Sequence, residues 1–219
     1  MKLILKAKQQ IAENIYSYTF SSKEPISWVA GQSIRLEIDG LYGTEERRFT
    51  ISSAPYEGDI TITTQVSNSD FKRALHDLQL QEEIDAFSIE GNFVWHKEKP
   101  ALFIARGMGI TPFISMLRQI SYEKDEDQEI ALIYSSKQGR ILFEEELSRL
   151  QKNMKLRLEY IFDTKISADF IKKVSPVLSD KTIYISGSSN MVDETSKVLI
   201  EACDVKELQL KRDWFIGLT

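Results

Sequence analysis

The sequence predicts a small antiparallel β-barrel followed by an α/β domain with a parallel sheet, divided between residues 98 and 99. Two patterns carry this prediction. Short strands separated by turn residues run to about residue 98, and strand and helix patterns alternate after it. A third observation is a glycine turn between a strand and a helix near mid-chain, which indicates where the second domain, 99–219, would bind a ligand.

Composition and charge argue against several classes of protein. The 219 residues carry a formal net charge of −5, which argues against a nucleic-acid binder. Cys203 is the single cysteine, so an intrachain disulfide and a four-cysteine metal site are excluded, and with two histidines no metal centre is expected. No apolar run approaches the ~20 residues of a membrane span, and no signal-peptide pattern is present. We therefore expect a cytoplasmic protein.

Six segments of the first domain, 1–98, have strand character because they alternate or are rich in β-branched and aromatic residues. Several short strands at this spacing predict a barrel or a sandwich. The segments are 2–6 around Leu3 and Leu5, 15–20, 33–38, 47–52, 59–66 and 83–89.

One helical pattern interrupts these strands. Ser67 or Ser69 can cap its N-terminus, and its apolar face follows from the spacing of Phe71 and Leu75. Lys72 falls in the first turn, where the helix dipole disfavours a cation unless an anion is bound. Two interpretations stay open at this point, a phosphate site and a solvated charge.

The second domain repeats strand and helix patterns, which predicts a parallel sheet covered by helices on both faces. Ligands of such sheets bind beyond the carboxyl ends of the strands. The strand segments are 101–105, 129–135, 155–161, 181–186 and 206–210, and the helical segments are 112–123, 142–152, 167–174 and 189–202.

The glycine turn joins the first strand of this domain to its first helix. Gly107 and Gly109 lie between an apolar run and Pro112, which is tolerated in a first helical turn. Free N–H groups and the positive end of the helix dipole would face one point, which is typical of a phosphate site. A plain turn that uses glycine only for its shape is the alternative, and the polar loops after the other strands can equally be ordinary surface loops.

Four segments, taken together and in order, resemble the motifs of the ferredoxin–NADP reductase superfamily. Residues 47–53, Arg-Arg-Phe-Thr-Ile-Ser-Ser, resemble its Arg-x-Tyr-Ser flavin motif, and 67–72 its second flavin phosphate segment. Residues 107–112, Gly-Met-Gly-Ile-Thr-Pro, resemble its Gly-x-Gly-Ile/Val-Thr-Pro nucleotide motif, and 186–191 its Cys-Gly-x-x-x-Met segment. The resemblance implies a flavin-binding barrel and a Rossmann-like nucleotide-binding domain.

The resemblance implies that the barrel holds FAD, the usual flavin of the family; no residue decides between FAD and FMN. Arg47 would contact a flavin phosphate, Phe49 would lie against the isoalloxazine ring, and the Thr50 hydroxyl would act catalytically by bonding flavin N5. The implied flavin-binding residues are Arg47, Phe49, Thr50, Ile51, Val66, Ser67, Ser69, Phe71 and Lys72.

For the nucleotide, the resemblance implies NADPH or NADH as substrate. It also implies Ser186 as a second catalytic residue, near the nicotinamide, where relatives often have cysteine. Cations and no carboxylate follow the second strand, which favours NADP over NAD, although they can equally be solvated loop charges. The implied residues are Gly107, Gly109, Ile110, Thr111, Pro112, Ser135, Lys137, Arg140, Gly187, Asn190 and Met191.

The activity implied is an NAD(P)H-dependent flavoprotein oxidoreductase that transfers electrons to a separate redox protein such as ferredoxin or flavodoxin. The alternatives are a reductase of free flavin or a small oxidant, and an electron-transfer subunit with weak nucleotide binding. Two residues motivate the electron-transfer subunit as an alternative. Arg106 stands where relatives usually have a small residue, and Leu218 stands where they often have an aromatic residue that covers the flavin. A basic rim for an acidic partner is expected from Arg47, Arg48, Lys72, Arg73, Lys211 and Arg212.

Overall fold

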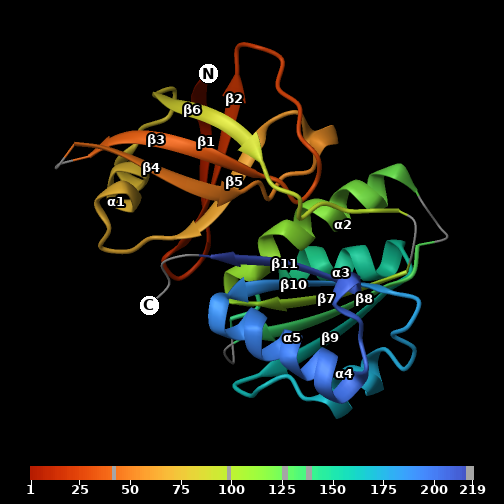
Figure 1. Cartoon of the computed structure of the whole chain (residues 1–219). Helices are drawn as coiled ribbons and strands as arrows, with labels where there is room; N and C mark the ends of the chain where they lie inside the picture. The colour runs from red at the N-terminus through yellow and green to blue at the C-terminus, as the bar shows by residue number, and fades with distance from the viewer. Residues whose placement is uncertain (41–42, 98–99, 125–127, 137–139, 216–219) are drawn as a thin grey trace.

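The chain folds around two sheets, an antiparallel one in its first half and a parallel one in its second (Figure 1). The structure is a computed structural model that describes residues 1–40, 43–97, 100–124, 128–136 and 140–215. The predicted fold class is confirmed. The predicted division between residues 98 and 99 falls outside the described ranges and stays a prediction.

The first sheet has six strands in the order β4-β3-β6-β1-β2-β5. Its two edge strands approach each other through a bridge between Ile51 and Ile62, which curls the sheet towards a barrel. Apolar side chains from alternate positions fill the interior, as the period of two predicts. The strands are β1 (Lys2–Ala12), β2 (Ile15–Ser22), β3 (Ser33–Gly40), β4 (Gly43–Thr50), β5 (Ile60–Gln65) and β6 (Glu83–Glu90).

Helix α1 (Asp70–Asp77) packs on the barrel through Phe71 and Leu75, both fully buried. Of the two cap candidates, Ser69 is the residue whose hydroxyl accepts a hydrogen bond from the Lys72 backbone N–H, at 3.4 Å. Ser67 bonds only to Ser69. Ser69 is therefore the N-cap of α1.

Replacing Ser69 with alanine is expected to lower the free energy of unfolding by about 1 kcal/mol, because the Lys72 amide loses its cap. Urea-induced unfolding followed by circular dichroism measures this change. Ser67→Ala is the matched control and should change the free energy by less than about 0.5 kcal/mol. Equal losses in the two variants would contradict the assignment of the cap.

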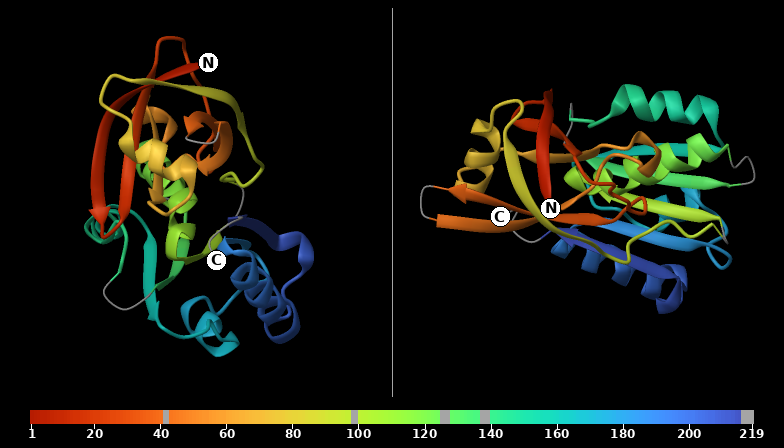
Figure 2. Two further views of the ribbon diagram at one scale, coloured as in Figure 1. Left: turned by 90° about the vertical axis from the view of Figure 1, so that its left-hand side faces the viewer. Right: turned by 90° about the horizontal axis from the view of Figure 1, so that it is seen from above.

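The second sheet has five parallel strands in the order β11-β10-β7-β8-β9. Helices α2 and α3 cover one face and α4 and α5 the other, so the sheet is buried on both sides (Figure 2). The strands are β7 (Ala101–Arg106), β8 (Ile130–Ser136), β9 (Leu156–Phe162), β10 (Thr182–Ser188) and β11 (Leu210–Phe215). The helices are α2 (Thr111–Glu123), α3 (Glu144–Asn153), α4 (Ala168–Val174) and α5 (Ser189–Cys203).

The predicted strand at 206–210 was wrong. A 3₁₀ turn occupies Glu207–Gln209, and β11 begins at Leu210, opposite Ile183. The buried Gln209 amide explains the turn, since it donates to the carbonyls of Leu178 and Lys181 at 2.8 and 2.9 Å. The predicted strand at 47–52 is also shifted, to Gly43–Thr50, and the first strand extends to Ala12.

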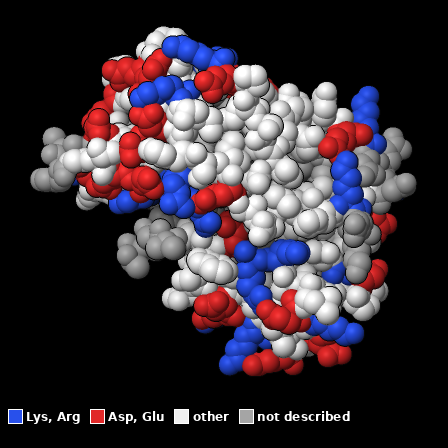
Figure 3. Space-filling view, turned by 45° about the horizontal axis from the view of Figure 1, so that its top comes forward, with Lys and Arg blue, Asp and Glu red and all other residues white. Residues whose placement is uncertain are grey.

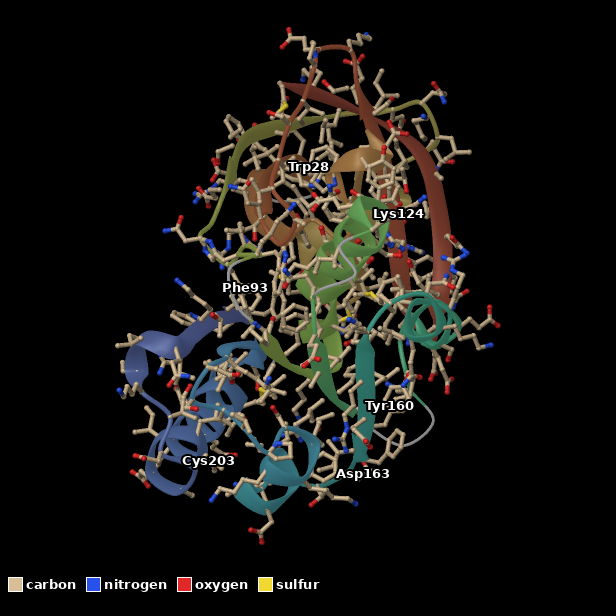
Figure 4. The ribbon with its side chains drawn as sticks, turned by 90° about the vertical axis from the view of Figure 1, so that its right-hand side faces the viewer. Trp28, Phe93, Lys124, Tyr160, Asp163 and Cys203 are labelled. Carbon is tan, nitrogen blue, oxygen red and sulfur yellow. The ribbon has the colours of Figure 1, made fainter. Side chains whose placement is uncertain are left out.

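The two domains meet where α2 lies against the barrel segment that follows β4. The Ser53 carbonyl accepts hydrogen bonds from the Ser115 hydroxyl at 2.6 Å and from the Trp28 indole at 3.3 Å. Phe93, which lies at the junction in Figure 4, packs on Phe113 of α2. Polar and aromatic contacts thus hold the barrel at the amino-terminal half of α2. No helix in the described ranges is long and apolar enough to cross a membrane.

Candidate functional site

A cavity of about 240 Å³ opens between the barrel and the second domain. We call it the interdomain cavity. Strands β4 and β5 and the start of α1 form its barrel side, and the glycine turn and the end of β11 form the other. Its lining residues are Arg47, Arg48, Phe49, Thr50, Thr63, Thr64, Gln65, Ser67, Ser69, Lys72, Met108, Thr111 and Phe215.

Two cations of this cavity repel each other. The pKa of Lys72 is lowered, first because its ammonium group is partly buried and then because Arg47 is nearby. Arg47 forms an ion pair with Glu45 at 2.6 Å, which neutralises only part of this charge. Both cations line the wall that includes the N-cap of α1, where helix N–H groups favour negative charge. This wall therefore fits an anionic group such as a flavin phosphate.

Phe49 belongs to the cavity wall and to the barrel core at once. It is 9% exposed, and its ring centroid lies 5.5 Å from that of Phe71. Thr50, also buried, lies beside it at the end of β4 and lines the same cavity. The end of β4 thus brings an aromatic residue and a hydroxyl residue to the lining of one cavity.

Three residues of the implied flavin set do not line this cavity. Ile51 and Phe71 are fully buried within the barrel core, where they support Phe49. Val66 uses its backbone N–H in a bond of 2.8 Å to the Asn14 carbonyl of the β1–β2 turn. These three residues therefore have structural roles next to the cavity and do not line it.

The glycine turn is itself helical, which differs from the predicted loop before a helix. Gly107–Ile110 form a 3₁₀ turn that continues directly into α2. Because the carbonyl of the N-cap, Arg106, accepts the first bond of such a turn from the third residue, Gly109, the donors with no partner inside the turn are those of Gly107 and Met108. The Tyr134 hydroxyl donates to the Gly107 carbonyl at 3.1 Å, and the Thr111 hydroxyl donates to the Met108 carbonyl at 3.0 Å.

The two glycines of the turn have different roles. Gly107 has φ +55° and open space around it, so it supplies a left-handed conformation. A Cβ on Gly109 would lie 2.0 Å from the Ser186 carbonyl oxygen. Gly109 therefore lets the turn pack against the end of β10. The sequence had indicated only a phosphate site or a plain turn for this glycine, and not this packing role.

The carboxyl ends of β7, β8 and β10 meet at this turn. Ser186 pairs with Ala105, and Ser135 pairs with Arg106, so two serines flank the turn. Both serines are buried, and the Ser186 hydroxyl donates to Asp213 at 3.3 Å. The predicted convergence of strand ends is therefore present.

The remaining residues implied for the nucleotide are dispersed around this edge. Arg140 forms an ion pair of 3.0 Å with Glu13 of the barrel turn. Asn190 is exposed in the first turn of α5, whereas Met191 is buried against Gly187. Ile110 and Pro112 are buried and support the turn. Lys137 lies outside the described residues.

Arg106 projects away from the interdomain cavity. It lies on the α5 face of the sheet, where it lines a separate cavity of about 370 Å³ with Lys165 and Met191. The interdomain cavity, lined on that side by Met108 and Thr111, does not include it. The suggested effect of Arg106 on nucleotide binding stays a prediction.

Sequence reasoning missed several residues of the cavity. Thr63, Thr64 and Gln65 end β5 just before Ser67. A polar strand end next to a motif segment was the sequence signal that could have identified them as cavity residues. Phe215 lines the cavity, whereas Leu218, the predicted counterpart of the terminal aromatic, lies outside the described residues. Trp214 is 46% exposed and so lies outside the core.

Comparisons with known proteins agree with this architecture. Residues 103–197 match the family model of the oxidoreductase NAD-binding domain. The chain is 28% identical over 226 residues to the "Probable flavin reductase" of Aliivibrio fischeri, covering 94% of this chain and 93% of that protein. It is 25% identical over 231 residues to flavohemoprotein A of Dictyostelium discoideum, covering 94% of this chain but only 58% of that protein.

Among solved structures, the FAD/NAD-binding domain of the nitric oxide dioxygenase from Vibrio cholerae superposes with a TM-score of 0.85. The sequence identity is 16%, and the match covers 98% of each chain, so this likeness concerns the fold. A barrel with an anion-fitting cavity is thus joined to an α/β domain that matches the oxidoreductase NAD-binding domain. In its fold and in its match to the NAD-binding domain, the chain resembles the ferredoxin–NADP reductase-like superfamily of two-domain FAD- and NAD(P)-binding oxidoreductases.

Proposed function

We propose that the protein holds FAD in the interdomain cavity and uses it to oxidise NADPH or NADH. The observation that carries this proposal is the cavity itself, whose lining combines two mutually repelling cations, an aromatic residue and a hydroxyl residue with Met108 and Thr111 at the glycine turn. Bound FAD would accept a hydride from the nicotinamide and release electrons one or two at a time. The protein's own contribution is binding, orientation and exclusion of water.

Each wall of the cavity has a distinct part in this proposal. Arg47, Lys72 and the N-terminus of α1 would hold the flavin phosphates. Phe49 and Phe215 would bound the ring, and the Thr50 hydroxyl would orient it by a hydrogen bond. The free N–H groups of the glycine turn would hold the nucleotide pyrophosphate beside it, with Ser186 and Gly187 at the nicotinamide end.

Arg47→Gln is expected to weaken FAD binding roughly 10- to 100-fold, the range for losing a charge-assisted contact to phosphate. The apoprotein should not lose stability, because the repulsion with Lys72 is removed at the same time. Flavin fluorescence titration of the apoprotein measures the first effect, and thermal unfolding measures the second.

The matched control is Arg73→Gln, which removes a cation of helix α1 that does not line the cavity. It should bind FAD within about twofold of the wild type. Equal weakening in both variants would mean that the long-range charge of the barrel, rather than a contact of Arg47, attracts the flavin.

The electron acceptor has two candidates, a separate redox protein as the first and free flavin as the second. The expected basic rim is less basic than its sequence suggested, since four of its cations are paired with carboxylates. On the face shown in Figure 3, cationic and anionic side chains are interspersed along the barrel. The pairs are Arg47 with Glu45, Arg48 with Asp213, Arg73 with Asp70 and Arg212 with Glu207.

This neutralised rim favours the second candidate, as does the relative from Aliivibrio fischeri. Turnover with free FMN, with flavodoxin and with ferredoxin, each at low and high salt, separates the two. A protein acceptor that docks by charge gives a rate that falls steeply with salt, whereas free flavin gives a nearly flat one.

The proposal itself is tested by the absorbance of the purified protein during anaerobic addition of NADPH and, separately, NADH. Bleaching of a flavin band supports it, and the more effective nucleotide decides the predicted preference for NADP. A protein that binds no flavin even after addition of FAD would refute the proposal.

A further inference from the structure

One ion pair connects the two domains beside the interdomain cavity. Arg48 of β4 lies 3.8 Å from Asp213 of β11, measured from Nη2 to Oδ1. The other carboxylate oxygen of Asp213 accepts the hydrogen bond from the Ser186 hydroxyl. The Asp213 side chain is only 12% exposed, and Ser186 is fully buried.

The two residues of this pair are connected to both sides of the proposed site. On the barrel side, Arg48 stands between Arg47 and Phe49 in the strand that borders the cavity. On the other side, the Ser186 carbonyl is the group against which Gly109 packs. A short chain of contacts thus runs from β4 through Asp213 and Ser186 to the glycine turn.

Stability does not explain this arrangement. Burial raises the pKa of Asp213, and the opposing effects of Arg48 and Ser186 do not cancel it. A carboxyl whose pKa is higher in the folded than in the unfolded chain is ionised at a cost to folding. Near neutral pH the charged Asp213 therefore opposes folding slightly, as expected for a partly buried ion pair whose desolvation exceeds its attraction.

We propose that Arg48 and Asp213 form an interdomain clamp that sets the spacing between β4, which borders the proposed flavin site, and the glycine turn. Asp213 is then a positioning residue for hydride transfer, acting through Arg48 and Ser186. This inference rests on the proposed function, because its effect on rate requires both cofactors. Small changes in such spacing have large effects on rate, up to about 100-fold for a displacement near 1 Å.

The experiment compares Asp213→Asn, Arg48→Gln and the double variant, all as full-length protein reconstituted with FAD. Stopped-flow reduction by a saturating nucleotide should slow about tenfold in each single variant and no further in the double variant. Because Arg48 lines the interdomain cavity and Asp213 does not, FAD affinity is expected to stay within about twofold only in Asp213→Asn. The unfolding temperature at neutral pH should be unchanged or higher. Arg157→Gln, which removes an exposed ion pair with Glu159, is the control and should match the wild type.

Two results would overturn the clamp. Multiplying effects in the double variant would mean that Arg48 and Asp213 act separately, and unchanged rates in both single variants would mean that the pair sets no spacing. Hydrogen exchange of the β4 and β11 amides decides the matter even for a protein that binds no flavin. Faster exchange in both single variants supports the clamp, and unchanged exchange contradicts it, so its failure is distinguishable from failure of the proposed function.

Discussion

Arg118→Leu is expected to lower the free energy of unfolding by about 3 kcal/mol, the largest loss we expect from a single side chain. Arg118 projects from α2, and its Nε and Nη2 atoms donate to both carboxylate oxygens of Glu146 on α3, at 2.6 and 2.8 Å. The side chains of Arg118 and Glu146 are only 18% and 16% exposed. Leucine would leave the Glu146 charge partly buried without its partner, which is the costly way to break such a pair.

Arg118 also reaches the barrel. Its Nη1 atom donates to the Ser52 carbonyl at 3.2 Å and lies 3.4 Å from a carboxylate oxygen of Glu57. Burial alone would lower the pKa of Arg118, but its bonds with Glu146 and the nearby charge of Glu57 outweigh burial and raise it, so the guanidinium stays charged. Loss of Arg118 should therefore loosen the junction of α2 with the segment that follows β4.

Urea-induced unfolding measures the change in free energy. The double variant Arg118→Leu, Glu146→Leu removes both charges and should regain much of the loss, since no unpaired charge remains. Arg149→Gln is the matched control, because Arg149 is largely exposed and lies 3.9 Å from the same carboxylate. A single Arg118 variant as stable as the Arg149 variant would contradict the role of Arg118 at this junction.

Gly109→Ala is expected to cost about 2–3 kcal/mol of stability and to weaken nucleotide binding more than tenfold. The new methyl group would lie 2.0 Å from the Ser186 carbonyl oxygen and 2.8 Å from the Gly187 nitrogen. These are backbone atoms, so no side-chain rotation relieves the overlap. The turn has to move away from the end of β10, and its free N–H groups move with it.

Gly107→Ala separates this packing effect from conformational strain. Gly107 has φ +55° with nothing near its Cβ position, so alanine there should cost only about 1 kcal/mol. Unfolding temperatures and the nucleotide concentration for half-maximal flavin reduction compare the two variants. If Gly107→Ala is the more damaging of the two, the contact of Gly109 with Ser186 is not what holds the turn.

Much of the fold was predictable because its signals are local. A period of two marked the barrel strands, and a period near 3.6 marked helices such as α2, whose apolar residues recur on one face. Predictions failed where a distant partner decided the backbone. The strand expected at 206–210 gave way to a 3₁₀ turn because Gln209 bonds to carbonyls near Leu178, some thirty residues earlier in the chain.

The candidate site divides in the same way. The motif segments led to Arg47, Thr50 and the glycine turn, since each motif is a short run of residues with a recognisable order. The residues Thr63, Thr64 and Phe215 join the cavity only because β5 and β11 end beside β4 in space. No local pattern reports which strand ends will meet across a domain junction.

The sequence alone therefore determined the types of element, the order of the two sheets and the resemblance to the superfamily, which depend on periodicity and short motifs. Tertiary structure alone decided three features: the packing of Gly109 on Ser186, the pairing of Arg48 with Asp213, and the turning of Arg106 to the α5 face. Each of these depends on contacts between segments far apart in the chain. Hydrophobic periodicity specifies which face of an element is buried, but strand order and register specify what it is buried against.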